Sequence, residues 1–451
     1  MPALYLILAG ILCSVFVLFM FRGGVTLGTA GGWVVVTCIH GLLMKPLFVL
    51  FDIPSAAILD DLLFYGVTRE EYWIWGTISL VAYALFFLTM VLVGRYRKPV
   101  RSQRRSVEYW NWRLAFFLLI GVVGIVGYFA QFPELLLGMT KNSIAAIALD
   151  EYNSGGIWIN LANFAYVVSI CALINVGAGV ARRRSWLLFY TAVLLWVPFC
   201  YLSDQRGLML FTVVTYVVAY SKFIRPLSKK SIALGMFATI ALLLVKTLAR
   251  FLAGGSDLRD TAAQTLANVV GQNFVEHSKM IAIVKAIPNV LDFQYGYSYL
   301  NAMLVLIPRS LFPDKPFVNL DTTIGQAVFG CEVFGACAVP PGLMGESFLN
   351  FGVPGVFVMP VLMGILVGAM DLRFRMTRAG NTYQVLYLMS GLYIGMGILG
   401  SGLASSITQL IVQAVAVTTV CFTCRRSFAP SRAPGDFSAP VDGPRNSAAA
   451  A

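Results

Sequence analysis

Charged residues are scarce in this chain. Asp, Glu, Lys and Arg make up only 12% of its 451 residues, whereas soluble domains carry about 25%. Hydrophobic residues make up 58%. This composition excludes an ordinary soluble enzyme and indicates an integral membrane protein.

Histidine is nearly absent, and only one pair of cysteines has metal-site spacing. The two histidines are His40 and His277. Cys421 and Cys424 form a lone CxxC with no second pair and no histidine nearby, which argues against a metal site. Four other cysteines lie in or beside apolar runs and are expected to pack as small hydrophobic residues, namely Cys13, Cys38, Cys171 and Cys200.

Apolar runs recur along the chain at the length of membrane-spanning helices, which need about 20 residues each. We expect an all-α membrane protein with about 11 such helices, of which the seventh is short. The first run lacks a basic leading segment and a small-residue cleavage site, so we expect it to be retained. The expected spans are 3–21, 32–52, 73–93, 114–131, 156–178, 186–202, 208–221, 231–249, 353–370, 384–402 and 406–422.

The net charge of +12 is distributed in a way that argues against a nucleic-acid partner. Lys and Arg gather in short segments between the expected spans, and these segments all fall on one side of the membrane. The pattern predicts an amino terminus on the outer side of the membrane and a cytoplasmic carboxyl terminus, and it also suits contact with anionic membrane lipids. The basic segments are 95–105, 182–184, 222–230, 373–378 and 425–426.

A long polar stretch interrupts the apolar runs. Residues 250–351, between the eighth and ninth spans, are rich in charge, aromatic rings, Gly and Pro, and a loop of this length is usually functional. We expect it to form an outer, periplasmic loop with short helices, within a membrane domain at 1–426. Residues 427–451 are rich in Pro, Ala and Ser and are expected to form a disordered cytoplasmic tail.

Three cations lie where apolar spans meet the outer side. Arg206 occupies the turn SDQRG, either closing a hairpin beside Asp204 or clamping an anion. Arginine suits phosphate because its planar guanidinium forms paired hydrogen bonds. Lys246 and Arg250 lie four residues apart on one helix face, where they either snorkel to water or join Arg206 in a cationic pocket. The combination favours the pocket.

Residues 269–287 show the periodicity of an amphipathic helix. His277 falls on its apolar face. This histidine is either a packing residue or a general base that can also hydrogen-bond a phosphate. The i, i+3 spacing of Glu276 and Lys279 also allows a simple pair on the wet face.

The rest of the outer loop adds tyrosines and cations. Tyr295, Tyr297 and Tyr299 introduce an apolar run too short to span, so they suit either sugar stacking or the membrane interface. Arg309 and Lys315 follow at that boundary.

Glu346 lies just before the ninth span. Its carboxylate can accept a proton or a hydrogen bond from a sugar hydroxyl, or it can pair with an arginine. Cys331 and Cys337, six residues apart in the outer loop, either form a structural disulfide or stay free.

The segments IPRSLFPDKP (307–316) and PGLMGESFLNFG (341–352), together with the earlier SDQRG turn, resemble the Wzy-type O-antigen polymerases, a family of oligosaccharide repeat-unit polymerases. The resemblance covers about 200–370 and rests on the order of these short motifs and their shared membrane side. Arg206 matches the family's Arg-Gly turn, and Arg309 matches the Arg of its Pro-Arg segment. Further site residues are inferred from position alone, namely Lys246, Arg250, His277, Lys315 and Glu346.

The resemblance implies an all-α fold similar to membrane glycosyltransferases that use lipid-linked donors. Such an enzyme transfers a growing glycan from undecaprenyl diphosphate to a lipid-linked repeat unit. The product is a surface polysaccharide, which is the O-antigen of lipopolysaccharide, a capsule or an exopolysaccharide. No metal or cofactor is expected, because cations stabilise the departing diphosphate. The expected partners are the lipid-linked oligosaccharide, membrane lipids, a chain-length regulator and a flippase.

Two other functions are considered. An O-antigen ligase would share the topology and the cationic pocket, but its usual pattern of His, ten residues and Gly is not met, because Pro288 stands where the Gly would follow His277. A transporter or flippase of lipid-linked sugar would favour charges within both halves of the membrane domain and an internal repeat. Neither feature is seen.

Overall fold

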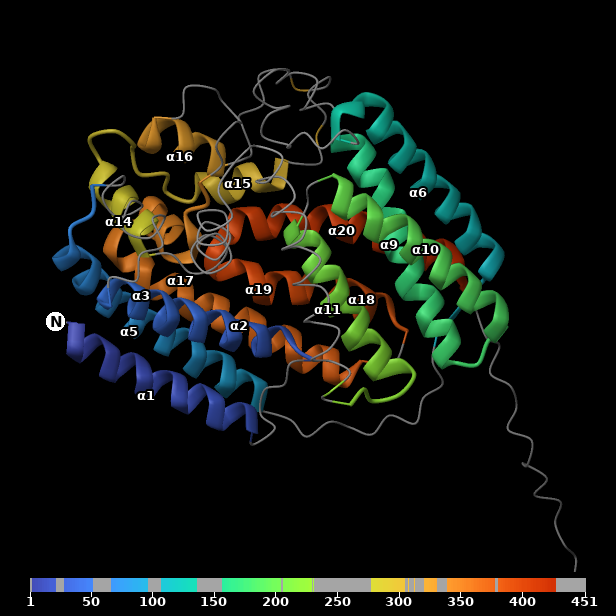
Figure 1. Ribbon diagram of the computed structural model, residues 1–451, viewed down its shortest axis with the longest axis horizontal. Helices are drawn as coiled ribbons and strands as arrows, with labels where there is room; N and C mark the ends of the chain where they lie inside the picture. Colours follow the sequence, from blue (N-terminus) through green and yellow to red (C-terminus); the bar gives the residue numbers. More distant parts are fainter. Residues whose placement is uncertain are drawn as a thin grey trace, which may run out of the picture.

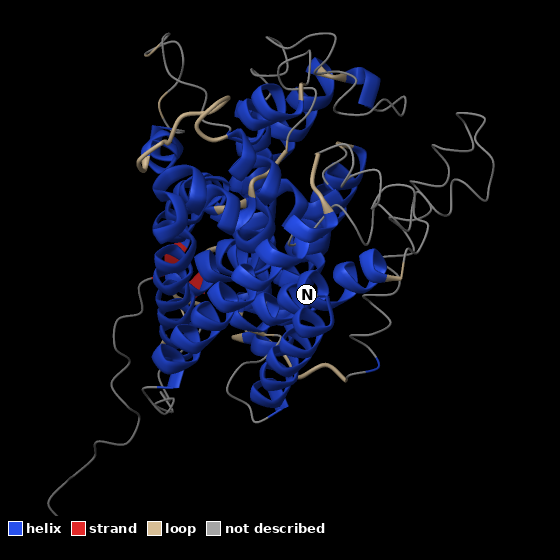
Figure 2. Cartoon of the chain, turned by 90° about the vertical axis from the view of Figure 1, so that its left-hand side faces the viewer, coloured by secondary structure: helices blue, strands red, loops and turns tan. Residues whose placement is uncertain are grey.

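The computed structural model describes residues 2–21, 28–51, 66–95, 107–135, 156–203, 206–228, 230, 277–304, 307, 312, 320–330, 339–377 and 380–426. Regular secondary structure within these ranges is helical, apart from one pair of two-residue strands (Figure 1, Figure 2). The expected all-α class is therefore confirmed for the described residues.

Seven helices are long and apolar enough to cross a membrane within the described ranges. Each coincides with one of the expected spans, and together they support a multi-pass membrane protein. They are α1 (Pro2–Phe21), α5 (Arg69–Arg95), α6 (Asn111–Gln131), α9 (Gly156–Gly177), α10 (Arg182–Leu202), α17 (Gly342–Met376) and α20 (Leu403–Cys424).

The expected number of eleven spans stays a prediction. Two expected spans are interrupted by π-helical turns, which widen the helix locally, and α11 (Arg206–Phe223) is short. The span 231–249 lies outside the described residues. The interrupted spans contain α2 (Ala30–Ile39), η1 (His40–Met44) and α3 (Lys45–Leu50), and α18 (Thr382–Leu386), η4 (Tyr387–Gly391) and α19 (Leu392–Ser401).

Small residues let the longest helices approach closely. Gly364 and Gly368 of α17 form a GxxxG pair against α5. A methyl group on Gly364 would overlap the Thr89 hydroxyl and the Phe86 carbonyl. In the same way, a methyl group on Gly121 of α6 would lie 2.8 Å from the Ala165 backbone of α9. Backbones this close gain dispersion contacts that lipid tails cannot replace.

The described basic segments lie at one end of the bundle, which we call the basic end. It contains the starts of α6 and α10 and the ends of α9, α11, α17 and α20. Arg113 of α6 donates to the Thr423 carbonyl of α20 at 2.6 Å, and Lys222 of α11 donates to the Phe374 carbonyl of α17 at 3.5 Å. This grouping agrees with one-sided basic loops, while the side of the membrane stays a prediction.

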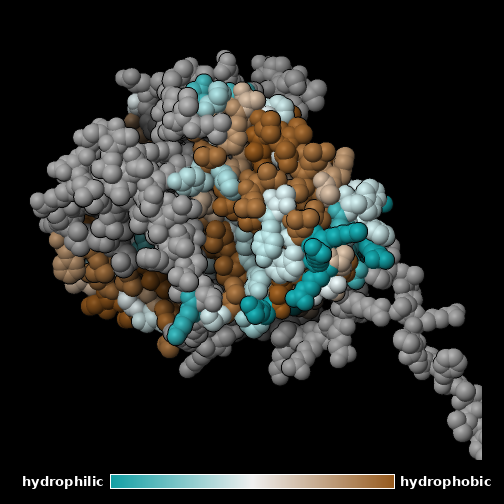
Figure 3. Space-filling model, turned by 45° about the vertical axis from the view of Figure 1, so that its right-hand side comes forward, coloured by the Kyte–Doolittle hydropathy of each residue, from teal (hydrophilic) through white to brown (hydrophobic). Residues whose placement is uncertain are grey.

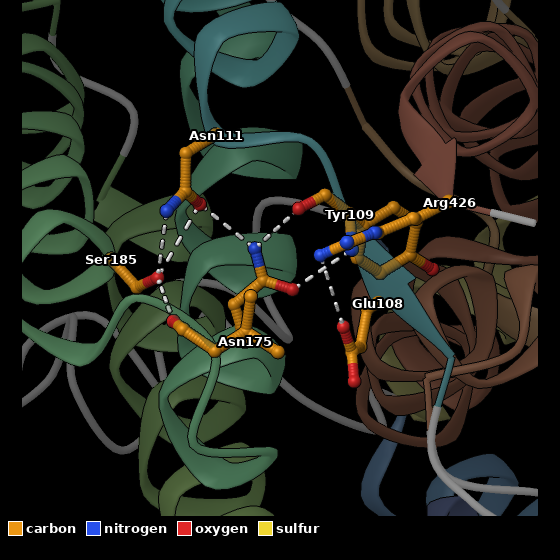
Figure 4. A network of polar contacts seen from close by, with 7 residues as sticks. Glu108, Tyr109, Asn111, Asn175, Ser185 and Arg426 are labelled. Atoms are coloured by element: carbon orange, nitrogen blue, oxygen red, sulfur yellow. Dashed lines mark hydrogen bonds and ion pairs between the residues drawn. The ribbon is translucent and has the colours of Figure 1, made fainter. Parts of the chain in front are cut away.

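A polar network fixes the basic end, centred on Asn175 at the end of α9 (Figure 4). The Asn175 amide pairs with both backbone groups of Tyr109, at 2.9 Å each, and donates to Asn111 at 2.9 Å. Ser185 of α10 joins through Asn111. Because Asn175 is fully buried, these bonds satisfy polar groups that would otherwise be costly.

The single strand pair lies beside this network. Strand β1 (Glu108–Tyr109) pairs antiparallel with β2 (Arg425–Arg426), and the Trp110 amide donates to the Cys424 carbonyl at 2.8 Å. The end of α20 is thereby tied to the start of α6.

The opposite end, which we call the site end, contains the starts of α1, α5, α17 and α20. The short helices α14 (His277–Ala286), α15 (Tyr297–Met303) and α16 (Leu320–Phe329) cover it, on the upper left in Figure 1. They belong to the expected outer loop, which does contain short helices. The 3₁₀ turn η2 (Pro133–Leu135) follows α6.

A buried carboxylate of α17 holds the start of α2. Asp371 accepts hydrogen bonds from the Ala30 amide at 3.2 Å and the Gly31 amide at 3.0 Å. The Tyr387 hydroxyl donates to it as well. Free amides at a helix start carry partial positive charge, so they partner a carboxylate well.

The six described cysteines are buried and form no disulfide. Their expected role as small packing residues is confirmed for Cys13, Cys38, Cys171 and Cys200. The candidate disulfide between Cys331 and Cys337 lies outside the described residues.

Candidate functional site

Glu346 occupies a helical segment at the site end. Helix α17 begins at Gly342, and its regular geometry breaks at Gly352, which has φ 64° and ψ −153°. Only glycine adopts this backbone region readily. The expected span at 353 thus begins at the break, but Glu346 lies in a preceding helical turn rather than in a loop.

The Glu346 carboxylate holds the start of α20. It accepts hydrogen bonds from the Leu403 amide and from the Ala404 amide, the latter at 3.0 and 3.2 Å to its two oxygens. The preceding residue, Gly402, has φ 92° and provides no side-chain cap. Glu346 is 1% exposed, so these amides and the helix dipole compensate a deeply buried group. The described contacts give Glu346 a capping role, and its role in proton transfer stays a prediction.

Two neutral side chains complete the surroundings of Glu346. Ser298 of α15 donates to the carboxylate at 3.3 Å. Asn350 donates to Ser298 at 2.9 Å and to the Glu346 carbonyl at 2.8 Å, and it accepts from the Gly296 amide at 2.9 Å. Helix α15 is therefore fixed to α17 around this carboxylate.

Asp321 of α16 is a second carboxylate, and it lies near the start of α20. The sequence did not single it out. The Ser405 hydroxyl lies 3.4 and 3.5 Å from its two oxygens. Burial raises the pKa of Asp321 to about 7, while Ser405 and the nearby charge of Lys279 oppose the shift. A carboxyl group that titrates near neutral pH suits proton transfer.

The raised pKa of Asp321 predicts that the free energy of unfolding depends on pH. Its pKa rises from 3.8 when unfolded to about 7 when folded, so the folded state binds the proton more tightly. Stability is then highest at low pH and falls as pH rises from about 4 to about 7. We expect Asp321→Asn to lose less thermal stability than the wild type between pH 5 and pH 8.

The matched control for this test is Asp292→Asn, because Asp292 is exposed and lies between α14 and α15. Thermal unfolding of the purified protein in detergent measures both variants. An unchanged pH dependence in Asp321→Asn would contradict the assignment.

His277 lies on the apolar face of α14, as expected. Its side chain is 1% exposed. The Tyr5 hydroxyl is 3.5 Å from Nε2, and the Tyr5 and Tyr72 rings meet the imidazole edge-on. His277 therefore joins α14 to α1 and α5, and whether it also transfers protons stays a prediction.

The expected wet-face position of Lys279 is wrong. Lys279 is only 9% exposed, because α5, α16 and α17 all pack around the short helix α14. Position 279 therefore faces neighbouring helices rather than bulk water. Instead, Lys285 is the residue of α14 that pairs with a carboxylate at the rim, Glu71, at 3.1 Å.

Most of the expected cations lie outside the described residues. Arg206 is the first residue of α11, and only its backbone is described. Of the tyrosines, Tyr295 and Tyr297 are exposed and Tyr299 is partly buried. Four expected site residues lie outside the described residues, namely Lys246, Arg250, Arg309 and Lys315.

No protein-family model, curated protein or solved structure matches this chain. Within the described ranges, no group of three His, Cys, Asp or Glu residues is placed to hold a metal ion.

Proposed function

We propose that this protein is an oligosaccharide repeat-unit polymerase of the bacterial inner membrane. It transfers a growing glycan from undecaprenyl diphosphate to a lipid-linked repeat unit. The site end faces outward, where lipid-linked repeat units are joined. The proposal rests on the resemblance of the Arg-Gly turn, the Pro-Arg segment and the segment around Glu346.

The observation that carries the proposal is the separation of the two ends. Helix α11 finishes at the basic end, where Lys222 contacts Phe374. The helix is 18 residues long, or about 27 Å, and Arg206 is its first residue. Arg206 therefore lies at the site end, which also contains Glu346, Asp321 and His277. The turn that resembles the family motif shares an end with the candidate acids and base.

The proposed reaction needs a cation and a base. The bond between the anomeric carbon and the diphosphate breaks, and the diphosphate leaves with its electron pair. The acceptor hydroxyl forms the new glycosidic bond and gives its proton to a base. Arg206 and Arg309 are assigned to the diphosphate, with Lys246, Arg250 and Lys315 as further cations, because fixed cations stabilise a developing anion strongly. Asp321, whose carboxyl lies beside Ser405 and whose pKa burial raises to about 7, is assigned as the base.

The test is a gel of the surface glycan and of the lipid-linked pool from a bacterial strain that lacks the gene. The same strain with the intact gene restored is the control. We expect single capped repeats without a ladder in the deletion strain and a full ladder after rescue. Full-length polymer stranded on the carrier would instead identify a ligase, and an unchanged ladder would redirect the proposal to transport.

A further inference from the structure

One corner of the basic end concentrates arginines and exposed tryptophans. The start of α6, the start of α10 and the end of α20 meet there through the strand pair and the Asn175 network. These three segments contain six arginines and one carboxylate, Glu108. The arginines are Arg113, Arg182, Arg183, Arg184, Arg425 and Arg426. The corner therefore carries a strong local positive charge.

The geometry holds two of these guanidinium groups over tryptophan rings. Arg113 lies 5.0 Å from the centre of the Trp112 ring, and Arg426 lies 4.7 Å from that of Trp110. Trp112 is 66% exposed. Exposed tryptophans are typical of the level of lipid headgroups. Stacking on a tryptophan ring fixes the position of an arginine side chain without using all its five N–H donors.

Positive charge at this corner exceeds the negative charge beside it. Arg113 donates to the Thr423 carbonyl, and Arg426 forms an ion pair with Glu108 at 3.9 Å. Arg182, Arg183 and Arg184 are all exposed at the start of α10. One carboxylate cannot neutralise this set.

Exposed apolar side chains lie about one helical turn from the arginines, on α6 and on α20. Phe116 follows Arg113 by three residues, so the two side chains share a face of α6. Phe116 is 58% exposed, and Phe422 of α20 is 86% exposed. Figure 3 shows such an arrangement on this side of the molecule, with hydrophilic residues grouped next to a broad hydrophobic surface.

We propose that this corner binds an anionic glycerophospholipid. The lipid phosphate sits among Arg113, Arg425 and Arg426, with the tryptophans at headgroup level, and the acyl chains lie along Phe116 and Phe422. The arginines match the phosphate of such a lipid, and the exposed apolar side chains beside them match its acyl chains. The site goes beyond the proposed glycan transfer, and its occupancy does not depend on that activity.

The test measures lipid binding to the purified full-length protein in detergent, using native mass spectrometry. The probes are dioleoyl phosphatidylglycerol, dioleoyl phosphatidylcholine and inorganic phosphate. We expect phosphatidylglycerol to bind more tightly than phosphatidylcholine, and inorganic phosphate not to displace it. The double variant Arg425→Ala with Arg426→Ala should weaken phosphatidylglycerol binding about tenfold or more, because each basic residue near a headgroup contributes to the attraction.

The matched control removes the same charge elsewhere at this end. Arg225 and Lys230 are both exposed, so Arg225→Ala with Lys230→Ala should bind phosphatidylglycerol within about twofold of the wild type. Trp112→Ala keeps all the charges, and we expect it to weaken binding as well. Equal binding of both lipids, equal loss in the control variant, or displacement by inorganic phosphate would overturn the proposal.

Discussion

Arg206→Ala is expected to abolish the polymer ladder while the protein stays folded and inserted. In the proposed reaction, negative charge develops on the departing diphosphate, and a guanidinium fixed beforehand stabilises it. Removing one such donor typically costs about 100-fold to 1,000-fold in rate, which is enough to remove visible polymer. The gel of surface glycan, read beside the amount of membrane-inserted protein, measures the effect.

Two comparisons make this result specific. Arg206→Lys keeps the charge but loses the planar fork, so we expect it to restore only part of the ladder. Arg225→Ala removes an exposed arginine at the basic end and should leave the ladder intact. Near-normal polymer from Arg206→Ala at equal protein level would remove Arg206 from the site.

Glu346→Ala should strongly destabilise the protein. The variant leaves the Leu403 and Ala404 amides buried without an acceptor, and it removes the acceptor of one Ser298 hydrogen bond. Removing one partner from a buried charged contact typically costs about 3–5 kcal/mol. We therefore expect a large fall in thermal unfolding temperature in detergent, with loss of the polymer ladder following from misfolding.

Glu346→Gln separates the capping role from a role in catalysis. The amide keeps one acceptor oxygen for the α20 amides, so its unfolding temperature should fall between those of the wild type and Glu346→Ala. Glu70→Ala, which removes an exposed carboxylate at the same end, should leave the unfolding temperature unchanged. A normally stable Glu346→Ala without polymer would show that the carboxylate acts in the reaction instead.

Much of the helical framework follows directly from hydropathy. Runs such as 3–21 and 156–178 predict α1 and α9 almost to the residue, because a membrane demands about 20 apolar residues with internally satisfied backbones. The predicted start at 353 also marks a real boundary, since Gly352 breaks α17 there.

The site was harder to predict, because its geometry depends on contacts between distant segments. The apolar stripe placed His277 inward correctly, but periodicity alone cannot show that three further helices pack against α14 or that Lys279 is buried. Asp321 gave no signal, since an isolated aspartate in a polar loop is ordinary. Its importance comes from Ser405, 84 residues later. Likewise, the sequence could not show that Glu346 would cap α20 instead of facing an arginine.

The two buried carboxylates of α17 also constrain how the molecule can move. Asp371 holds the start of α2, and Glu346 holds the start of α20 at the other end of the bundle. Any motion that separates α17 from either helix would strand a carboxylate in an apolar interior, which costs several kcal/mol. These three helices should therefore move as one rigid frame. A path for a lipid-linked substrate must then open by displacement of the elements around this frame.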